Sequence, residues 1–191
     1  SDEIHADLIY AGVQHIPTAS LSQEVSDITV TYFAPSKTFN IAGFCTSVYV
    51  AQDEGMRKTL SQSMTMLLGH PNVLGLYAAR AAYRFGRPWL DEVMRYLESN
   101  RDFLVQTITK EFPGVQIGKP EGTYLAWLDC RGLNLEVSPH LFFLEKAKVG
   151  LNNGENFGKT GKGFVRLNFG CPRALLEEGL ARMKNAIERK V

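Results

Sequence analysis

Lys37 lies in a segment whose residue types suit carbonyl chemistry. The segment runs Thr31-Tyr32-Phe33-Ala34-Pro35-Ser36-Lys37-Thr38-Phe39-Asn40-Ile41-Ala42-Gly43. A lysine that ends a strand among apolar and small side chains is partly desolvated, which favours the neutral amine and makes it a nucleophile towards an aldehyde. Ser36 and the backbone N–H groups of the turn could hold an anionic group of the same ligand. The alternative interpretation of Lys37 is a solvated surface charge, because lysine is almost never buried unless it is paired.

Arg166 is the second residue with a chemical signature. It lies in the middle of the apolar run Phe164-Val165-Arg166-Leu167-Asn168-Phe169-Gly170. An unpaired guanidinium in such a strand is costly, so the pattern predicts that Arg166 meets an anion. Two kinds of anion remain open on physical grounds: a buried Asp or Glu of the chain itself, or an anionic ligand.

The lysine segment resembles a known family of enzymes. Ser36-Lys37-Thr38-Phe39-Asn40-Ile41-Ala42-Gly43 is similar to the Schiff-base lysine segment of fold-type I pyridoxal-phosphate enzymes of the class I/II aminotransferase superfamily. Within that superfamily the chain looks like the C–S lyase branch, the MalY/PatB type that includes cystathionine β-lyase and cystalysin. The resemblance extends over nearly the whole chain, through Ser1-Asp2-Glu3-Ile4-His5, Glu121-Gly122-Thr123-Tyr124-Leu125 and the strand around Arg166.

The resemblance implies a role for each candidate site residue. Lys37 would carry pyridoxal 5'-phosphate, and Ser36 would contact its phosphate. Asp2 would face the pyridine nitrogen and keep it protonated, so that the ring acts as an electron sink. His5 takes the place where many relatives have a tyrosine near the 3'-oxygen; the alternative for both Asp2 and His5 is an exposed polar terminus. Arg166 would bind the α-carboxylate of an amino-acid substrate as a bidentate fork, a geometry that lysine cannot supply.

The activity implied by the resemblance is carbon–sulfur β-elimination. The expected substrates are L-cystathionine, L-cysteine or related thioethers, and the products are a thiol, pyruvate and ammonia. Aspartate-aminotransferase relatives commonly have phosphate-binding Ser and Arg residues where this chain has Ala34 and Cys45, and the C–S lyase branch departs from them similarly. An aminotransferase and a non-catalytic regulatory or binding module remain as alternatives. Family members are typically homodimers with shared sites, so a homodimer is expected.

The composition predicts a globular enzyme and argues against two classes of partner. The chain has 191 residues, 21 Lys and Arg, 20 Asp and Glu, and 45% hydrophobic residues. A net charge of +1 without a basic block argues against nucleic acid. No stretch approaches the ~20 apolar residues of a membrane helix, so a cytoplasmic location is the default expectation. Cys45, Cys130 and Cys171 are too scattered for a disulfide framework or a zinc cluster, and each is predicted to be a small buried hydrophobe.

The first half of the chain must position the lysine. The β-branched and aromatic run 28–33 predicts a strand that delivers Lys37 at its carboxyl end, and 44–50 predicts a second strand. Apolar spacing predicts helices from Glu54 to Arg87, broken at 69–72, with Asn72 as a helix N-cap. Core packing is the expected role of the methionines in the first of these helices, Met56, Met64 and Met66.

The second half must position the arginine. A long helix is predicted from 87 to 112, with Pro88 in its first turn. Strands at 115–117, 124–129 and 164–170, a helix at 139–148, a glycine-rich loop at 151–163 and a last helix at 173–188 are expected to follow it.

Together these elements predict an α/β fold in two parts. Residues 1–87 would be the C-terminal part of a large, mostly parallel-sheet domain that binds pyridoxal phosphate, and residues 88–191 a smaller α+β C-terminal domain. The chain opens inside a motif that lies near the middle of the resembling family, without Met. We therefore expect it to be about the C-terminal half of a parent enzyme and to be inactive, or nearly so, by itself.

Overall fold

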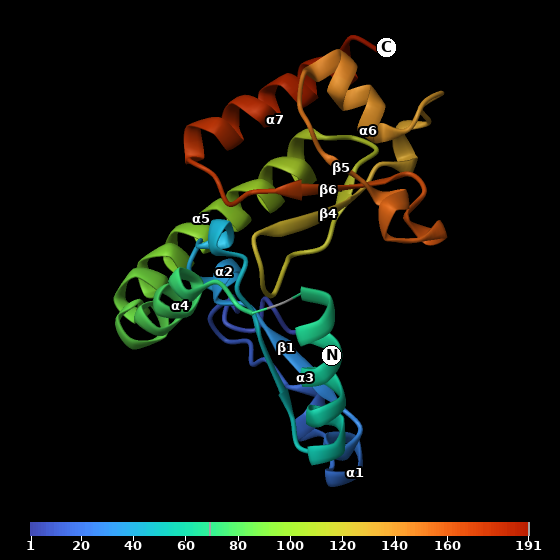
Figure 1. The fold of residues 1–191 in the computed structure, drawn as a ribbon. Coiled ribbons are helices and arrows are strands. Elements are labelled where there is room, and N and C mark those ends of the chain that lie inside the picture. The colour runs from blue at the N-terminus through green and yellow to red at the C-terminus, as the bar shows by residue number, and fades with distance from the viewer. Residues whose placement is uncertain (69, 191) are drawn as a thin grey trace. The chain divides into compact units, whose positions relative to one another are not determined.

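The computed structural model describes residues 1–68 and 70–190 and divides into two compact units, Ser1–Met94 and Arg95–Val191. Both units mix helices with strands, which confirms the α/β class (Figure 1). Gly69, part of the predicted helix break, lies outside the described residues.

The first unit is built on an antiparallel pair of strands, β1 (Val30–Phe33) and β2 (Val48–Ala51). Asp2 adds an isolated parallel bridge to Tyr32 of β1. Here the Glu3 N–H donates to the Tyr32 carbonyl at 3.0 Å, and the Tyr32 N–H donates to the Ser1 carbonyl at 2.9 Å. The two strand ladders of the described chain are antiparallel within themselves, so a mostly parallel sheet stays a prediction for a domain of which this chain supplies a part.

Strand β2 begins four residues later than the pattern from Phe44 predicts. Residues Ala42–Phe44 form the 3-10 helix η2 instead, and Cys45 follows with a left-handed backbone (φ 48°). This turn breaks the extended conformation until Val48. Cys45 is exposed, so its predicted burial is wrong, whereas Cys130 is buried and burial raises the pKa of its thiol to about 12.

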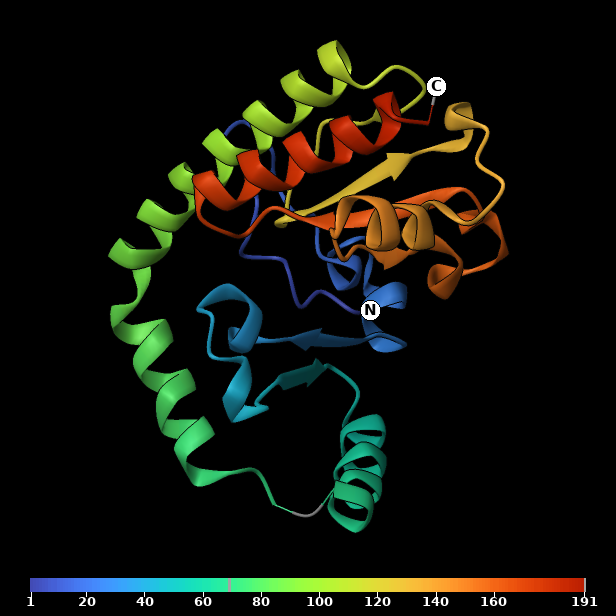
Figure 2. The same cartoon turned by 90° about the horizontal axis from the view of Figure 1, so that it is seen from above.

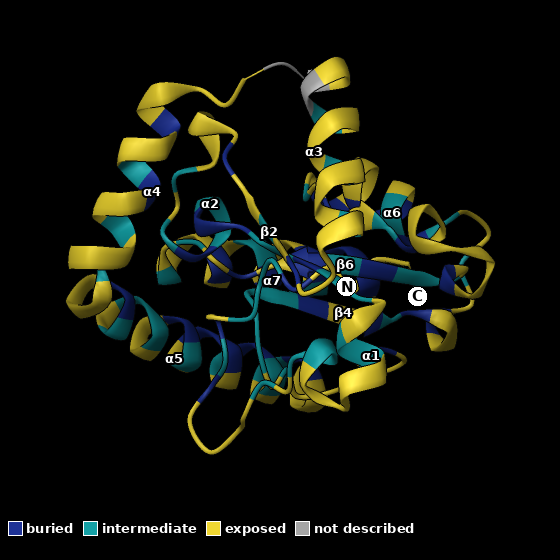
Figure 3. Cartoon of the chain, turned by 60° about the horizontal axis from the view of Figure 1, so that its bottom comes forward, coloured by how far each residue is buried: buried dark blue, intermediate teal, exposed yellow. Residues whose placement is uncertain are grey.

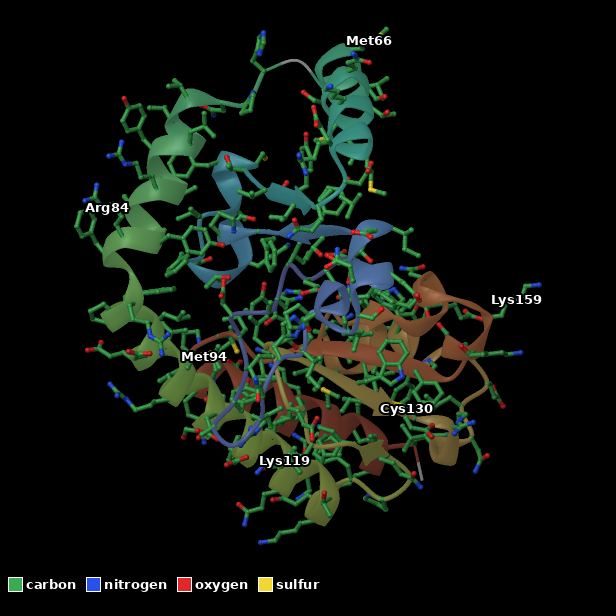
Figure 4. The ribbon with its side chains drawn as sticks, turned by 90° about the horizontal axis from the view of Figure 1, so that it is seen from below. Met66, Arg84, Met94, Lys119, Cys130 and Lys159 are labelled. Atoms are coloured by element: carbon green, nitrogen blue, oxygen red, sulfur yellow. The ribbon has the colours of Figure 1, made fainter. Side chains whose placement is uncertain are left out.

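Helices α3 (Glu54–Leu68) and α4 (Val73–Phe85) confirm the two predicted helical segments. Asn72 is the predicted N-cap, since its Oδ1 accepts from the Leu74 N–H at 2.9 Å. The expected core packing of the methionines is wrong for Met66, which is 87% exposed near the end of α3 (Figure 4). Most of both helices is exposed (Figure 3), including the large apolar side chains Met66, Leu67, Val73, Leu74, Leu76, Tyr77, Tyr83 and Phe85.

Helix α5 (Arg87–Glu111) confirms the long helix predicted after Gly86. The division between the two units falls inside this helix, after Met94. The functional boundary near Arg87 stays a prediction.

The second unit is a four-stranded antiparallel sheet in the order β3-β4-β6-β5. Its strands are β3 (Gln116–Ile117), β4 (Leu125–Asp129), β5 (Asn152–Asn153) and β6 (Phe164–Asn168). The part of α5 in this unit lies side by side with α7 (Arg173–Glu188) (Figure 2), and Lys184 pairs with Glu111 at 2.9 Å. The core of this unit contains Leu104, Ile108, Ala126, Leu128, Val165, Leu167, Leu176, Leu180 and Met183.

The connections are short helices and turns. Helix α1 (Gln23–Asp27) and the 3-10 helix η1 (Thr18–Ser20) flank Leu21, where a helical turn is predicted. The predicted helix from 139 is present as α6 (Pro139–Phe142), which Ser138 caps and which continues as the π-helix η4 (Phe143–Ala147). The other connections are α2 (Pro35–Thr38), η3 (Arg131–Leu133), η5 (Gly154–Phe157) and η6 (Lys159–Gly161). None of the described helices combines the length and apolar character needed to cross a membrane.

Candidate functional site

Lys37 lies in the single turn of helix α2. Only Ala34 separates the end of strand β1 from the start of this helix. Pro35 opens this turn, because its fixed φ suits the first helical position. The Lys37 side chain is half-buried and makes no ion pair or side-chain hydrogen bond within the described residues. Its amine is therefore available to a ligand as far as the described residues are concerned, and the prediction that β1 delivers Lys37 at its carboxyl end is confirmed.

Helix α2 is held against the turn that contains His5. The buried hydroxyl of Thr38, a side chain only 2% exposed, donates to Asp7 Oδ2 at 2.9 Å. His5 itself is half-buried. This hydrogen bond joins residues 31 positions apart, and sequence reasoning missed it because nothing local indicates the pairing.

Asp2 lies next to the same strand through its bridge to Tyr32. Its carboxylate is exposed, and its nearest hydrogen bond is a long one from the Ile4 N–H, at 3.4 Å. Ser36 in α2 is half-buried, and its hydroxyl has no hydrogen-bond partner among the described residues. The structure thus places Asp2, His5, Ser36 and Lys37 around β1 and α2 of one unit, while their roles stay predictions.

A buried carboxylate, Glu3, fixes the segment that carries Asp2. It accepts hydrogen bonds from the Thr18 N–H at 2.9 Å and from Ser1 Oγ at 3.0 Å, and it contacts His15 Nε2 at 2.7 Å. Burial raises the pKa of Glu3, but the hydrogen bonds from His15, Thr18 and Ser1 outweigh it and leave that pKa below its ordinary value. The charged form of Glu3 therefore ties the chain start to the loop around Thr18.

Arg166 lies on the outer face of the sheet in the second unit. Because side chains alternate along β6, its neighbours Val165 and Leu167 point to the core while Arg166 stays half-buried. Its partners are Asn152 Oδ1, which accepts from Nε at 3.3 Å and from Nη2 at 3.2 Å, and the Phe157 ring, 4.4 Å from the guanidinium carbon. The alternative of a buried Asp or Glu partner is wrong for the described residues: Arg166 forms none of their ion pairs.

Aromatic rings adjoin Arg166 on this face, and sequence reasoning missed their arrangement. Trp127 pairs with Arg166 across β4 and β6, meets Phe157 edge-on at 5.5 Å between ring centroids, and stacks on Phe164 at 5.6 Å. Tyr124 lies nearby: burial raises the pKa of its hydroxyl, and the charge of Arg166 partly offsets this rise. The alternation of β4 and β6 could have placed these side chains on one face, but the register that brings them together is a long-range property.

The two groups of residues have distinct chemical capacities. A half-buried primary amine can add to an aldehyde, and adjacent carboxylate and hydroxyl groups can bind a cationic ring nitrogen and an anion. A guanidinium whose polar partner is a neutral amide keeps its full charge for a carboxylate. The first capacity belongs to the unit Ser1–Met94 and the second to the unit Arg95–Val191.

Comparison with known proteins places the chain in a family. The family model for aminotransferase class I and II matches residues 1–183, and the chain belongs to this family. It is 43% identical over 189 residues to cystathionine β-lyase PatB of Bacillus subtilis (strain 168), covering 98% of this chain and 49% of PatB. Protein MalY of Escherichia coli (strain K12) is 36% identical, with 98% of this chain and 48% of MalY covered.

A solved structure shows the same fold. The crystal structure of cystalysin from Treponema denticola, which contains a pyridoxal 5'-phosphate cofactor, matches with a TM-score of 0.94 and 32% identity, covering 100% of this chain and 49% of cystalysin. The chain spans about half the length of each of these relatives. The resemblance inferred from the lysine and arginine segments is thereby confirmed.

Proposed function

We propose that the full-length protein carrying this chain is a pyridoxal-phosphate-dependent C–S β-lyase. It cleaves L-cystathionine or a related cysteine thioether, with water, to a thiol, pyruvate and ammonia. The observation that carries the proposal is the half-buried Lys37, whose amine has no partner among the described residues, in the turn that follows β1. One relative of this chain is named cystathionine β-lyase PatB, and the structure of another, cystalysin, contains pyridoxal 5'-phosphate.

The residues around β1 fit the cofactor by their chemistry. Lys37 offers an amine to its aldehyde, and the exposed Asp2 offers a carboxylate to its ring nitrogen. The Ser36 hydroxyl, which has no partner in the described part of the chain, offers a contact to its phosphate. His5, in the adjoining turn, is proposed to lie near its 3'-oxygen. When bound, pyridoxal phosphate supplies an electron sink for the negative charge that develops at the substrate Cα.

The chain's own residues then orient the substrate and move its proton. Arg166 is proposed to bind the α-carboxylate, which fixes the direction of the bonds at Cα. Lys37 Nζ is the proposed base that takes the Cα proton, because a neutral amine can accept it. The Cβ–S bond then breaks, its electron pair leaves with the sulfur, and addition of water to the three-carbon remainder gives pyruvate and ammonia.

Product analysis of the full-length protein tests this function. We expect incubation with pyridoxal phosphate and L-cystathionine to release pyruvate and ammonia in equal amounts, without a keto-acid acceptor. Amino transfer to a keto acid without pyruvate would replace the lyase by an aminotransferase. The 191-residue chain alone serves as the control, for which we expect little or no turnover; neither product from the full-length protein would favour the regulatory alternative.

We also propose that the full-length protein is a cytoplasmic homodimer. The support for association is the set of exposed apolar side chains on α3 and α4, among them Met66 and Leu67 at 87% and 82% exposure. Exposed large apolar side chains are covered either by a second copy or by another part of the full-length protein, and the homodimer is the first of these. Light scattering at micromolar concentration should give twice the mass of one full-length polypeptide. The mass of a single polypeptide at that concentration would contradict the dimer.

A further inference from the structure

Two arginines on the outer face of the second unit's sheet have similar aromatic neighbours but different polar partners. Arg166 lies over Phe157 at 4.4 Å, and Arg131 lies over Phe164 at 4.8 Å. Both rings contact Trp127. Their polar partners decide which of the two arginines can receive an anion.

The charge of Arg131 is already neutralised by a carboxylate. Arg131 Nε and Nη2 donate to Asp129 Oδ1 and Oδ2 at 2.9 and 2.6 Å, and this pairing holds the pKa of Asp129 below its ordinary value. The Arg166 guanidinium instead donates to an amide oxygen, which carries no charge. Arg166 is therefore the one of the two that keeps a net positive charge on this face.

The hydrogen bonds of Arg166 also decide which of its edges is free. Asn152 Oδ1 accepts from both Nε and Nη2 and so occupies the side edge of the guanidinium. Nη1 has no hydrogen-bond partner among the described residues. The free edge is the one formed by Nη1 and the second N–H of Nη2, whose two parallel donors match the two oxygens of a carboxylate.

Phe157 fixes the plane in which that free edge lies. Its ring supports the guanidinium from one face and is itself held edge-on by Trp127. The loop that carries it is compact because Gly154 and Gly161 approach backbone to backbone, and a Cβ on either would collide with the carbonyl of the other. Asn153 caps η5 in the same loop by accepting from the Glu155 N–H at 3.2 Å.

We propose that Asn152 and Phe157 are positioning residues that present the Nη1–Nη2 edge of Arg166 to a carboxylate end on. This inference rests on the proposed function, in which Arg166 receives the α-carboxylate of the substrate. Asn152 acts by occupying the Nε–Nη2 edge of Arg166, which could otherwise receive the carboxylate, without cancelling the charge of the guanidinium. Phe157 acts by preventing the guanidinium from tilting. Neither residue needs to touch the substrate.

The test is binding of L-alanine to the full-length protein loaded with pyridoxal phosphate, measured by titration calorimetry so that it does not depend on turnover. L-Alaninamide, which lacks the carboxylate, is the second probe. Asn152→Ala should weaken L-alanine about tenfold, because a charge-assisted hydrogen bond orients the fork. Asn152→Asp should weaken it about tenfold more, because a carboxylate beside Arg166 cancels its charge. Binding of L-alaninamide should not change in either variant.

Asn152→Asp separates positioning from a structural role. Aspartate keeps the acceptor oxygen and would pair with Arg166 more strongly, so a purely structural role predicts binding and thermal stability at least as good as in Asn152→Ala. L-Alanine binding to the Asn152→Asp variant that equals the unaltered protein, or exceeds Asn152→Ala, overturns the inference. Phe157→Leu should weaken L-alanine several-fold, while the matched control Arg131→Met should leave it unchanged.

Arg166→Ala distinguishes failure of this inference from failure of the proposed function. If Arg166→Ala weakens L-alanine and the Asn152 variants do not, the positioning role is wrong and the carboxylate site stands. If Arg166→Ala itself has no effect on L-alanine, Arg166 is not the carboxylate site, and both proposals about this face are wrong.

Discussion

Replacement of Lys37 by alanine is expected to lower β-elimination by the full-length protein by at least about 10³-fold. The substitution removes both the nucleophile towards the cofactor aldehyde and the base for the Cα proton, and general acid–base catalysis alone contributes about 10²–10⁴-fold. Within the described residues, the Lys37 amine has no hydrogen bond or ion pair to lose, so the fold should be retained. Pyruvate release from L-cystathionine measures the first effect and thermal unfolding the second.

Covalent labelling provides a readout of Lys37 that does not depend on turnover. Borohydride reduction of the loaded protein should leave the cofactor mass on the peptide that contains Lys37, and the Lys37→Ala protein should lack this label. Lys37→Arg keeps the charge but cannot become a neutral nucleophile, so it should behave like alanine. Lys58→Ala is the matched control, since Lys58 is exposed and paired with Glu54. Full elimination activity in Lys37→Ala would contradict the proposed role.

Replacement of Asn100 by alanine is expected to destabilise the second unit by about 3 kcal/mol. Asn100 is 0% exposed in α5; its Nδ2 donates to the carbonyls of Phe169 and Cys171 at 3.1 and 2.9 Å, and its Oδ1 accepts from Arg173 Nε at 2.9 Å. Alanine leaves buried carbonyl groups without donors, at about 1–3 kcal/mol for each unsatisfied group. Urea unfolding of the full-length protein followed by circular dichroism measures the shift of the midpoint.

Two further variants check the cause of this loss. Asn100→Asp keeps the size but cannot donate to either carbonyl, so its loss of stability should be as large as that of alanine. Ser99→Ala removes an exposed contact to the same Arg173, at 2.9 Å, and should change stability by less than ~0.5 kcal/mol. An unchanged midpoint in Asn100→Ala would show that relaxation or water compensates the lost hydrogen bonds.

Local patterns in the sequence predict most of the helices and strands. The apolar spacing of α3, α4, α5 and α7 and the β-branched run of β1 are properties of neighbouring residues, and the structure confirms them. The predicted start of β2 at Phe44 was wrong, because the turn at Ala42–Phe44 and the left-handed backbone of Cys45 depend on three-dimensional context. The exposure of Met66 was also missed, since periodicity identifies an apolar face but not what covers it.

Some residues of the candidate site could be predicted from short stretches of sequence, whereas their contacts depend on residues far apart in the chain. Lys37 and Arg166 could be selected because each is a charged residue in an apolar surrounding, which is visible in a short stretch of sequence. One of the two alternatives for the partner of Arg166, a buried Asp or Glu, was wrong for the described residues, because it assumed full burial, whereas Arg166 on the outer face of β6 is half-buried. The other alternative, an anionic ligand, stays a prediction. Asn152 reaches Arg166 through the pairing of β5 with β6, and no local signal specifies that register.

The close approach of Gly154 and Gly161 has a consequence for how the loop tolerates mutation. A Cβ at either glycine would collide with the backbone carbonyl of the other, so neither glycine can be replaced without displacing backbone. The residues between them, Glu155 to Thr160, are exposed and bear no such restriction, apart from Phe157 under Arg166 and Gly158, whose φ of 125° favours glycine. Sequence variation here should therefore be blocked at Gly154 and Gly161 by backbone contact, restricted at Gly158 by its φ, and permissive at the exposed positions between them other than Phe157.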